Sequence, residues 1–186
     1  PWEPDKPVIT SWDLGIGDST AIWCAQRVGK EIRLINYYEN SGVGLEHYAK
    51  YLSELPYSYE EHLVPHDANV RELGTGRSRV ETAQSMGIRM RVVPKLGLED
   101  GINATRMMLR SMWFDEEKCA RGIQALREYT KSQIEGERGP DGEVLYRDRP
   151  RHNWASHGAD ALRTLAVGLR PERMGEMRQP DTSYVV

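Results

Sequence analysis

Three aspartates in this sequence lie next to segments that would carry them to the rim of a β-sheet. Asp13 closes the apolar run of residues 8–12, and Asp67 follows the short run of residues 62–66, so both are expected at strand ends. Asp160 lies near the start of the last helical segment. Carboxylates from two strand ends and one helix meet only where the two strands are neighbours. We therefore expect the three acids to converge at one edge of a sheet.

Such a group of carboxylates is typical of a site for hard divalent cations. Mg²⁺ prefers one or two carboxylates together with water and substrate phosphate. Two such ions about 3.5 to 4 Å apart activate water on one side of a phosphodiester and stabilise the leaving oxygen on the other. Taken alone, Asp13 fits a turn cap through an Asx hydrogen bond equally well. The two later acids favour nuclease chemistry.

Two histidines are close in sequence to these acids. His157 precedes Asp160 by three residues and is expected on the same helical face. It has the chemistry to bind a metal, orient a water or assist proton transfer, although a helical histidine is as often a surface or packing residue. His66 precedes Asp67 and is expected on the opposite side of a pleated strand.

Three further acids are weaker candidates. Asp18 is a reserve ligand close to Asp13, but its place before Ser19 also suits a turn cap. Asp100 and Asp148 are interpreted as an ordinary helix-start acid and loop acid.

Basic residues gather in one part of the chain although the formal net charge is only −3. Residues 69–95 contain six Lys and Arg against two acids, whereas residues 1–68 contain five against eleven. A solvated surface explains this distribution, and so does a footprint for a polyanion. Glycines in the loop after Asp67 would let its backbone approach a phosphate. The predicted DNA contacts are Arg71, Arg77, Arg79 and, more weakly, Lys95. Phosphate contacts carry no base code, so we expect little sequence preference and strong weakening by salt.

The composition is that of an ordinary soluble domain. The 186 residues are 39% hydrophobic and 28% charged, and the length suits one domain with its own core. No apolar run is long enough for a membrane span, and no secretory leader opens the chain, so we expect a soluble intracellular protein. The chain opens without Met, and we expect it to be a piece of a longer polypeptide. Cys24 and Cys119 have no metal-type spacing and are expected to be buried.

Hydrophobic periodicity predicts an α/β fold with a central mixed sheet flanked by helices. An antiparallel three-strand meander opens it, and later strands pair in parallel. The predicted domain covers residues 1–169, and a polar, disordered tail covers residues 170–186. The predicted strands are residues 8–13, 20–28, 31–39, 62–66 and 88–93; the predicted helices are residues 45–52, 78–86, 98–112, 115–126 and 154–169; a polar hairpin or loop is predicted at residues 132–149.

This order of elements resembles the ribonuclease H-like nuclease fold, and within it the C-terminal nuclease domain of the large terminase subunit of tailed bacteriophages. The resemblance spans nearly the whole chain up to the tail. It is carried by Trp12-Asp13-Leu14-Gly15, Gly17-Asp18-Ser19-Thr20-Ala21, Pro65-His66-Asp67-Ala68 and His157-Gly158-Ala159-Asp160-Ala161-Leu162-Arg163.

The resemblance implies a metal-dependent endonuclease that cuts concatemeric double-stranded viral DNA when packaging starts and ends. It implies two divalent ions, Mg²⁺ or Mn²⁺, with Asp13 bridging both while Asp67 and Asp160 each complete one site. His157 is predicted as a catalytic residue because of its place beside Asp160. The implied partners are DNA, an N-terminal packaging ATPase, the portal and the small terminase subunit, with the isolated domain monomeric in the host cytoplasm. Gly74-Thr75-Gly76-Arg77-Ser78 lacks the lysine and spacing of a nucleotide-binding loop.

Other functions stay open at this point. A junction resolvase or transposase core shares the superfamily, and a resolvase should be an obligate dimer that prefers branched DNA. A sugar-kinase or actin-like ATPase also carries an acidic phosphate loop in its first hairpin, but it needs a second loop and a duplicated fold. A non-catalytic module would dock a motor or portal through residues 132–149.

Overall fold

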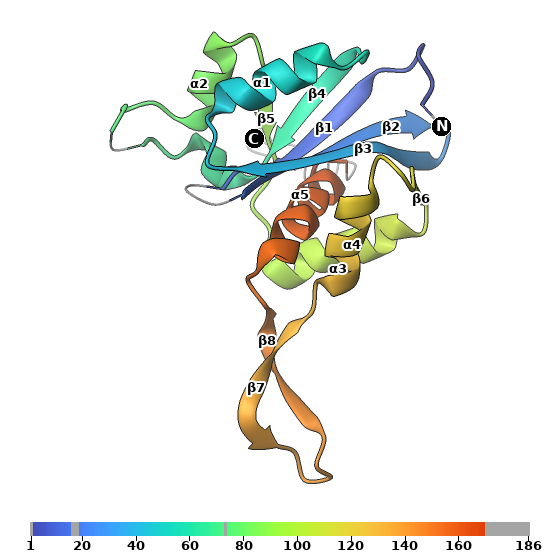
Figure 1. Cartoon of the computed structure of the whole chain (residues 1–186), viewed down its shortest axis with the longest axis vertical. Coiled ribbons are helices and arrows are strands. Elements are labelled where there is room, and N and C mark those ends of the chain that lie inside the picture. The colour runs from blue at the N-terminus through green and yellow to red at the C-terminus, as the bar shows by residue number, and fades with distance from the viewer. Residues whose placement is uncertain (1, 16–18, 73, 170–186) are drawn as a thin grey trace, which may run out of the picture.

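A six-stranded mixed sheet forms the centre of the molecule, with the strand order β5-β4-β1-β2-β3-β6 (Figure 1). The computed structural model describes residues 2–15, 19–72 and 74–169. The strands are β1 (Val8–Asp13), β2 (Ser19–Val28), β3 (Glu31–Ser41), β4 (Tyr59–Val64), β5 (Met90–Val92) and β6 (Met112–Phe114).

The predicted meander is confirmed. Strand β2 pairs antiparallel with both β1 and β3, and Gly29 provides the positive φ of 61° that the tight β2–β3 turn requires. Strand β4 pairs in parallel with β1, with Ser11 opposite Leu63, and β5 pairs in parallel with β4. The carboxyl ends of β1 and β4 therefore lie side by side at one rim of the sheet.

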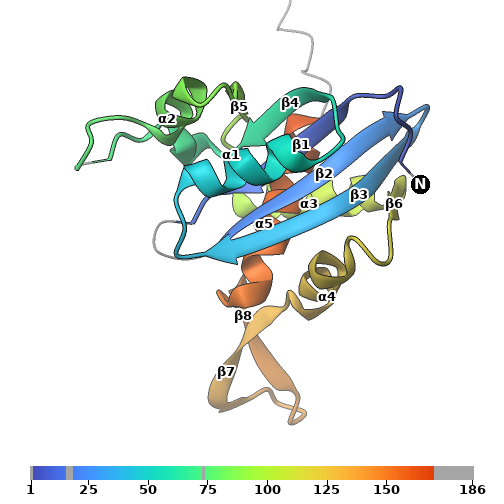
Figure 2. The same cartoon turned by 45° about the horizontal axis from the view of Figure 1, so that its top comes forward.

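Helices cover both faces of the sheet (Figures 1 and 2). One face carries α1 (Leu45–Glu54) and α2 (Arg79–Ser85), and the other carries α3 (Leu98–Leu109), α4 (Ala120–Glu128) and α5 (Trp154–Gly168). Alternation along the strands separates two apolar cores, so that Trp12 packs under α1 while Trp23 packs under α4 and α5. Both indoles are fully buried.

Helix α5 lies close against the sheet because its sequence is rich in small residues. The Trp23 indole Nε1 donates a 2.8 Å hydrogen bond to the carbonyl of Gly158 on α5. A Cβ on Gly158 would lie 2.9 Å from the Tyr37 hydroxyl. This close approach fixes the first turns of α5, which carry His157 and Asp160, relative to strands β2 and β3.

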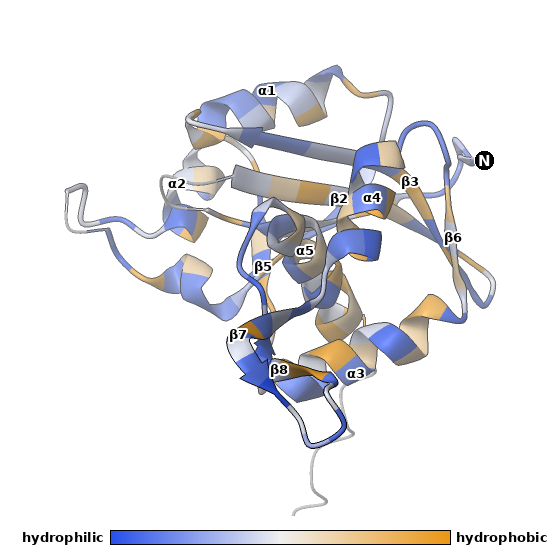
Figure 3. Ribbon diagram, turned by 60° about the horizontal axis from the view of Figure 1, so that its bottom comes forward, coloured by the Kyte–Doolittle hydropathy of each residue, from blue (hydrophilic) through white to orange (hydrophobic). Residues whose placement is uncertain are grey.

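The polar segment between α4 and α5 is a protruding hairpin, as predicted. It consists of β7 (Lys131–Arg138) and β8 (Val144–Pro150), which form a separate two-stranded sheet. The ribbon extends beyond the helical layer (Figure 1) and is mostly hydrophilic (Figure 3).

Several boundaries differ from the sequence-based prediction. The helix predicted at residues 115–126 begins only at Ala120, as α4. Residues 98–112 do not form one helix, because α3 ends at Leu109 and Met112 belongs to β6, which pairs in parallel with β3. Strand β4 ends at Val64, and Pro65 leads into the 3₁₀ helix η1 (His66–Asn69). Asp67 therefore lies on a helical turn after the strand.

Other expectations have simple outcomes. Cys24 and Cys119 are free and buried. No helix in residues 2–15, 19–72 and 74–169 combines the length and apolar character that a membrane span needs. Asp18 and residues 170–186 lie outside the described residues.

Candidate active site

The three predicted acids line one hollow of about 290 Å³ at the rim of the sheet. Asp13 ends β1, Asp67 lies on η1 directly after β4, and Asp160 lies on α5. Parallel pairing of β1 with β4 brings the first two to the same edge, and packing of α5 on the sheet brings the third. Residues far apart in the sequence therefore share one cavity.

The His157 imidazole contacts the Asp13 carboxylate. Its Nδ1 atom lies 3.1 Å from Oδ2 of Asp13, where a protonated Nδ1 donates to the carboxylate. The imidazole is only 5% exposed, so this contact orients the Asp13 carboxylate from inside the protein.

The Asp160 carboxyl has a raised pKa. Burial raises its pKa to about 6, the Arg163 guanidinium opposes that rise, and repulsion from Asp13 adds to it. Its Oδ1 atom is buried and has no hydrogen-bond partner among the described residues, although Nη1 of Arg163 lies 3.1 Å away. The contact is thus a charge pair without good hydrogen-bond geometry.

These acids fit a divalent cation in the type of their donor atoms. A buried carboxylate oxygen without a hydrogen bond, on a side chain that a second carboxylate repels, is an environment that a cation would stabilise. Among the residues that the structure describes, no three His, Cys, Asp or Glu side chains are grouped closely enough to hold a metal ion as they stand. Since Mg²⁺ takes one or two carboxylates and fills the rest with water and phosphate, the pair Asp13 and Asp160 meets its minimum, and the exposed Asp67 lines the same hollow.

His66 was expected on the opposite side of the strand from Asp67, and that expectation is wrong. Both residues lie on the 3₁₀ helix η1 and line the hollow of the acids. The pleat alternation that separates neighbouring residues ends at Val64, where the strand ends.

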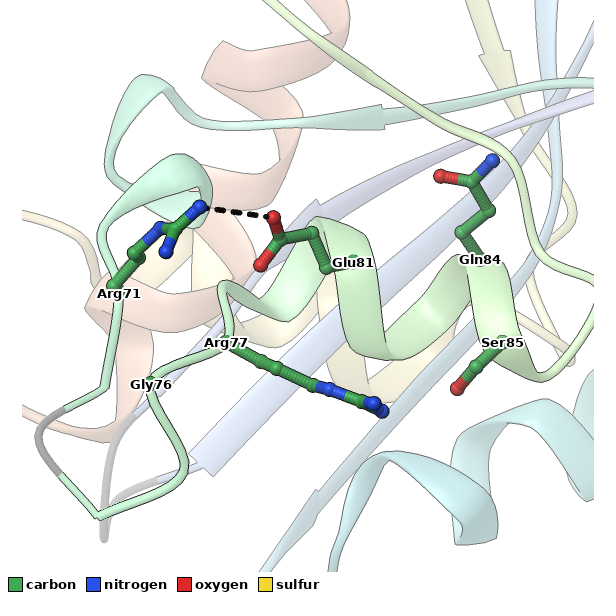
Figure 4. A pocket seen from close by; sticks show the side chains of 6 residues that line it. All are labelled: Arg71, Gly76, Arg77, Glu81, Gln84 and Ser85. Carbon is green, nitrogen blue, oxygen red and sulfur yellow. Dashed lines mark hydrogen bonds and ion pairs between the residues drawn. The ribbon is translucent and has the colours of Figure 1, made fainter.

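Two of the predicted DNA-binding arginines line a different, larger hollow of about 440 Å³ (Figure 4). It lies between the loop after η1 and helix α2, and none of the three acids lines it. Arg71 approaches Glu81 there, with 3.5 Å between Nη2 and Oε1, while Arg77 extends along α2 (Figure 4). The open shape of this hollow and its two arginines suit a polyanion that passes over the surface.

Arg79 and Lys95 have different surroundings. The Arg79 side chain is only 14% exposed, and its Nη1 donates a 2.8 Å hydrogen bond to the carbonyl of Leu14. This contact ties α2 to the chain just after Asp13, which makes Arg79 a structural anchor of the site. Lys95 is exposed in the loop after β5, beside two residues that line the acid hollow.

Arg163 is the site residue to which the sequence assigned no role. It lines the acid hollow beside Asp160, and the spacing of three residues on a helix was the available signal. Gly101 of α3 lines the same hollow and gives room to the Arg163 stem.

The meander, the parallel strands beyond it and the acids at the shared rim define a ribonuclease H-like α/β protein. The terminase RNaseH-like domain family matches residues 10–143, and the chain belongs to this family. A comparison with curated protein sequences gives no match.

Solved structures of phage terminases share the fold. The large terminase of a thermophilic bacteriophage has a TM-score of 0.63 at 15% identity over 89% of this chain, which spans 40% of that protein. The nuclease domain of the large terminase g2p from bacteriophage SPP1, with bound Mn, has a TM-score of 0.62 at 14% identity, covering 85% of this chain and 84% of that one. The large terminase nuclease of phage G20c, with bound cobalt, has a TM-score of 0.56 at 16% identity, covering 89% and 82%.

Proposed function

We propose that the chain is the nuclease part of a large terminase and hydrolyses phosphodiester bonds of double-stranded viral DNA with divalent metal ions. The observation that carries the proposal is the shared hollow of Asp13, Asp67 and Asp160. Family membership and the metal-containing SPP1 and G20c nuclease structures support it.

In this proposal the chain's own residues hold the reacting groups in place. Asp13 and Asp160 bind the cations, Asp67 completes the site from η1, and His157 orients Asp13. Divalent ions at these carboxylates would supply an activated water and stabilise the leaving 3′ oxygen. Arg71 and Arg77 contact the DNA backbone away from the acids.

The partners belong to the same proposal. The chain spans 40% of the first of the large terminases described above, whose structures include complexes with ADP and ATP-gamma-S. We propose a packaging ATPase as the remaining part of the full subunit, with the portal and small terminase subunit as assembly partners in the host cytoplasm.

A plasmid-nicking assay with Mn²⁺, Mg²⁺ and chelator tests the proposal. We expect cutting only with metal and a loss of at least about 100-fold in Asp67→Asn, because removing a charged ligand weakens the cation site. Asp5→Asn is the matched control, since Asp5 is 79% exposed and does not line the hollow. Cutting in chelator, or full activity of Asp67→Asn, would contradict the proposed chemistry.

His157 provides a second prediction. We expect His157→Ala to slow cutting by about 10- to 100-fold, since loss of a group that orients a metal ligand typically has that effect. His157→Gln retains a side-chain donor toward Asp13 and should lose less. The measurement is the nicking rate at saturating Mn²⁺, and equal rates for wild type and His157→Ala would show that the contact has no catalytic role.

The third prediction concerns the basic hollow. Replacing Arg71 and Arg77 with Gln should make the slope of log DNA affinity against log salt shallower by about 1 to 2, because each phosphate contact contributes about 0.9. The matched double variant is Arg110→Gln with Arg127→Gln, which removes two exposed charges that line neither hollow. An unchanged slope in the first variant would place the DNA elsewhere.

A further inference from the structure

Arg163 lies on the boundary between the acid hollow and a second cavity. That cavity, of about 250 Å³, is a groove between α3, α4 and the base of the hairpin. Asp160 and Arg163 line both spaces, so this pair forms the wall between them. Arg163 is therefore next to the carboxylate that the proposed cation needs.

The contact between the two side chains is close but incompletely formed. Nη1 of Arg163 lies 3.1 Å from Oδ1 of Asp160, and the side chains are 28% and 27% exposed. The same Oδ1 has no hydrogen-bond partner among the described residues. A guanidinium that met the carboxylate in its preferred geometry would form directed hydrogen bonds. Here the charge of Asp160 is compensated while the lone pairs of Oδ1 stay available to another cation.

Helix α3 is shaped to receive the Arg163 side chain. A Cβ on Gly101 would lie 2.6 Å from Cδ and 3.0 Å from Cγ of Arg163. Glycine is unfavourable inside a helix, so its presence in α3 is best explained by the space that the arginine stem occupies. The Tyr129 phenol interacts with both Asp160 and Arg163 from the groove side. The arginine is thus held at Asp160 by its surroundings as well as by charge.

We propose that Arg163 is a built-in competitor of the divalent cation at Asp160. It neutralises the carboxylate while no metal is bound, and the cation must displace it from Oδ1. The inference rests on the proposed metal-dependent function and deepens it, because it makes Arg163 a positioning residue that restrains loading of the site. The restraint acts before any DNA is cut.

Isothermal titration with Mn²⁺ alone, without DNA, tests this competition. Arg163→Gln should bind Mn²⁺ about tenfold more tightly than wild type, the effect of removing a modest, partly buried ion pair. Gly101→Ala should give an intermediate increase, since its methyl group displaces the arginine stem while the charge remains. This variant should fold, because the group that must move is a flexible side chain.

A matched control separates direct competition from general electrostatics. Arg106→Gln removes the same charge from the groove wall, where Nη1 of Arg106 is 3.4 Å from Asn103 and does not contact Asp160. It should change the Mn²⁺ affinity less than about twofold, because exposed charges are screened. Equal gains in Arg106→Gln and Arg163→Gln would overturn the inference, as would an Arg163→Gln affinity within twofold of wild type.

Asp13→Asn distinguishes failure of the inference from failure of the proposed function. If wild type binds Mn²⁺ and Asp13→Asn does not, the metal site stands and the arginine variants alone decide about competition. If neither wild type nor Arg163→Gln binds Mn²⁺, the metal site and the competition are both rejected.

Discussion

Asp160→Asn should abolish DNA cutting and at the same time make the metal-free protein more stable. The loss of cutting should reach at least about 10³-fold, equivalent to about 4 kcal/mol of transition-state stabilisation. An asparagine keeps the shape of the side chain but loses the charge that a cation needs. The nicking rate in Mn²⁺ measures this first effect.

The gain in stability follows from the raised pKa of Asp160. Its pKa is about 6 in the folded protein against an ordinary value of 3.8, so the folded state binds the proton more tightly than the unfolded state. Stability is therefore lost as the pH rises between these two values, and the penalty is complete above pH 6. Removing the charge should add about 2 kcal/mol at pH 7.5 and roughly half of that at pH 5. Denaturant unfolding in chelator at both pH values measures the gain.

Asp13→Asn is the informative comparison, because it lies across the same hollow. It should also abolish cutting, but it weakens the 3.1 Å contact with His157 and should lose stability. The two acids would then be equally necessary for cutting and opposite in their effect on folding. A destabilised Asp160→Asn would show that its pair with Arg163 outweighs the cost of burial.

The convergence of the acids could be predicted from sequence because it depends on topology. Two strand ends and a late helix reach one rim whenever β1 and β4 pair in parallel, and hydrophobic periodicity indicated those elements. Whether the side chains of the site form well-directed hydrogen bonds with one another depends on side-chain packing instead. The spacing of Asp160 and Arg163 indicates that the two are neighbours on a helix but not that their pair is incomplete, and the His157–Asp13 contact leaves no pattern in the chain.

The errors also have physical causes. Strand β6 has only three residues at the sheet edge, too few for alternation to distinguish it from a continuing helix. The turn at Pro65 breaks the pleat and brings His66 to the side of Asp67. The hydrogen bond from Arg79 to Leu14 has no signal in the sequence, because it depends on how α2 folds back on the sheet, and the predicted contact of Arg79 with DNA stays a prediction.

Gly122→Ala should destabilise the fold strongly, although alanine is normally the better residue inside a helix. A Cβ at this position of α4 would lie 2.4 Å from Cη2 of Trp23 and 2.7 Å from Cγ of Tyr37. Both rings are buried and rigid, so the helix has to move away from the sheet. Overpacking of this kind costs about 3 kcal/mol, which lowers the melting temperature by roughly 10 °C for a chain of this size.

Gly101→Ala is the control, because the atoms nearest to its Cβ belong to the flexible side chain of Arg163, and the melting temperature should stay within about 3 °C. The displacement in Gly122→Ala should also reach the candidate active site. The Trp23 indole that is pushed away donates to the carbonyl of Gly158, one turn or less from His157 and Asp160 on α5. We therefore expect Gly122→Ala to lose cutting even at temperatures where it remains folded. An unchanged melting temperature would mean that α4 can shift freely, and normal cutting by a destabilised variant would mean that α5 is positioned independently of Trp23.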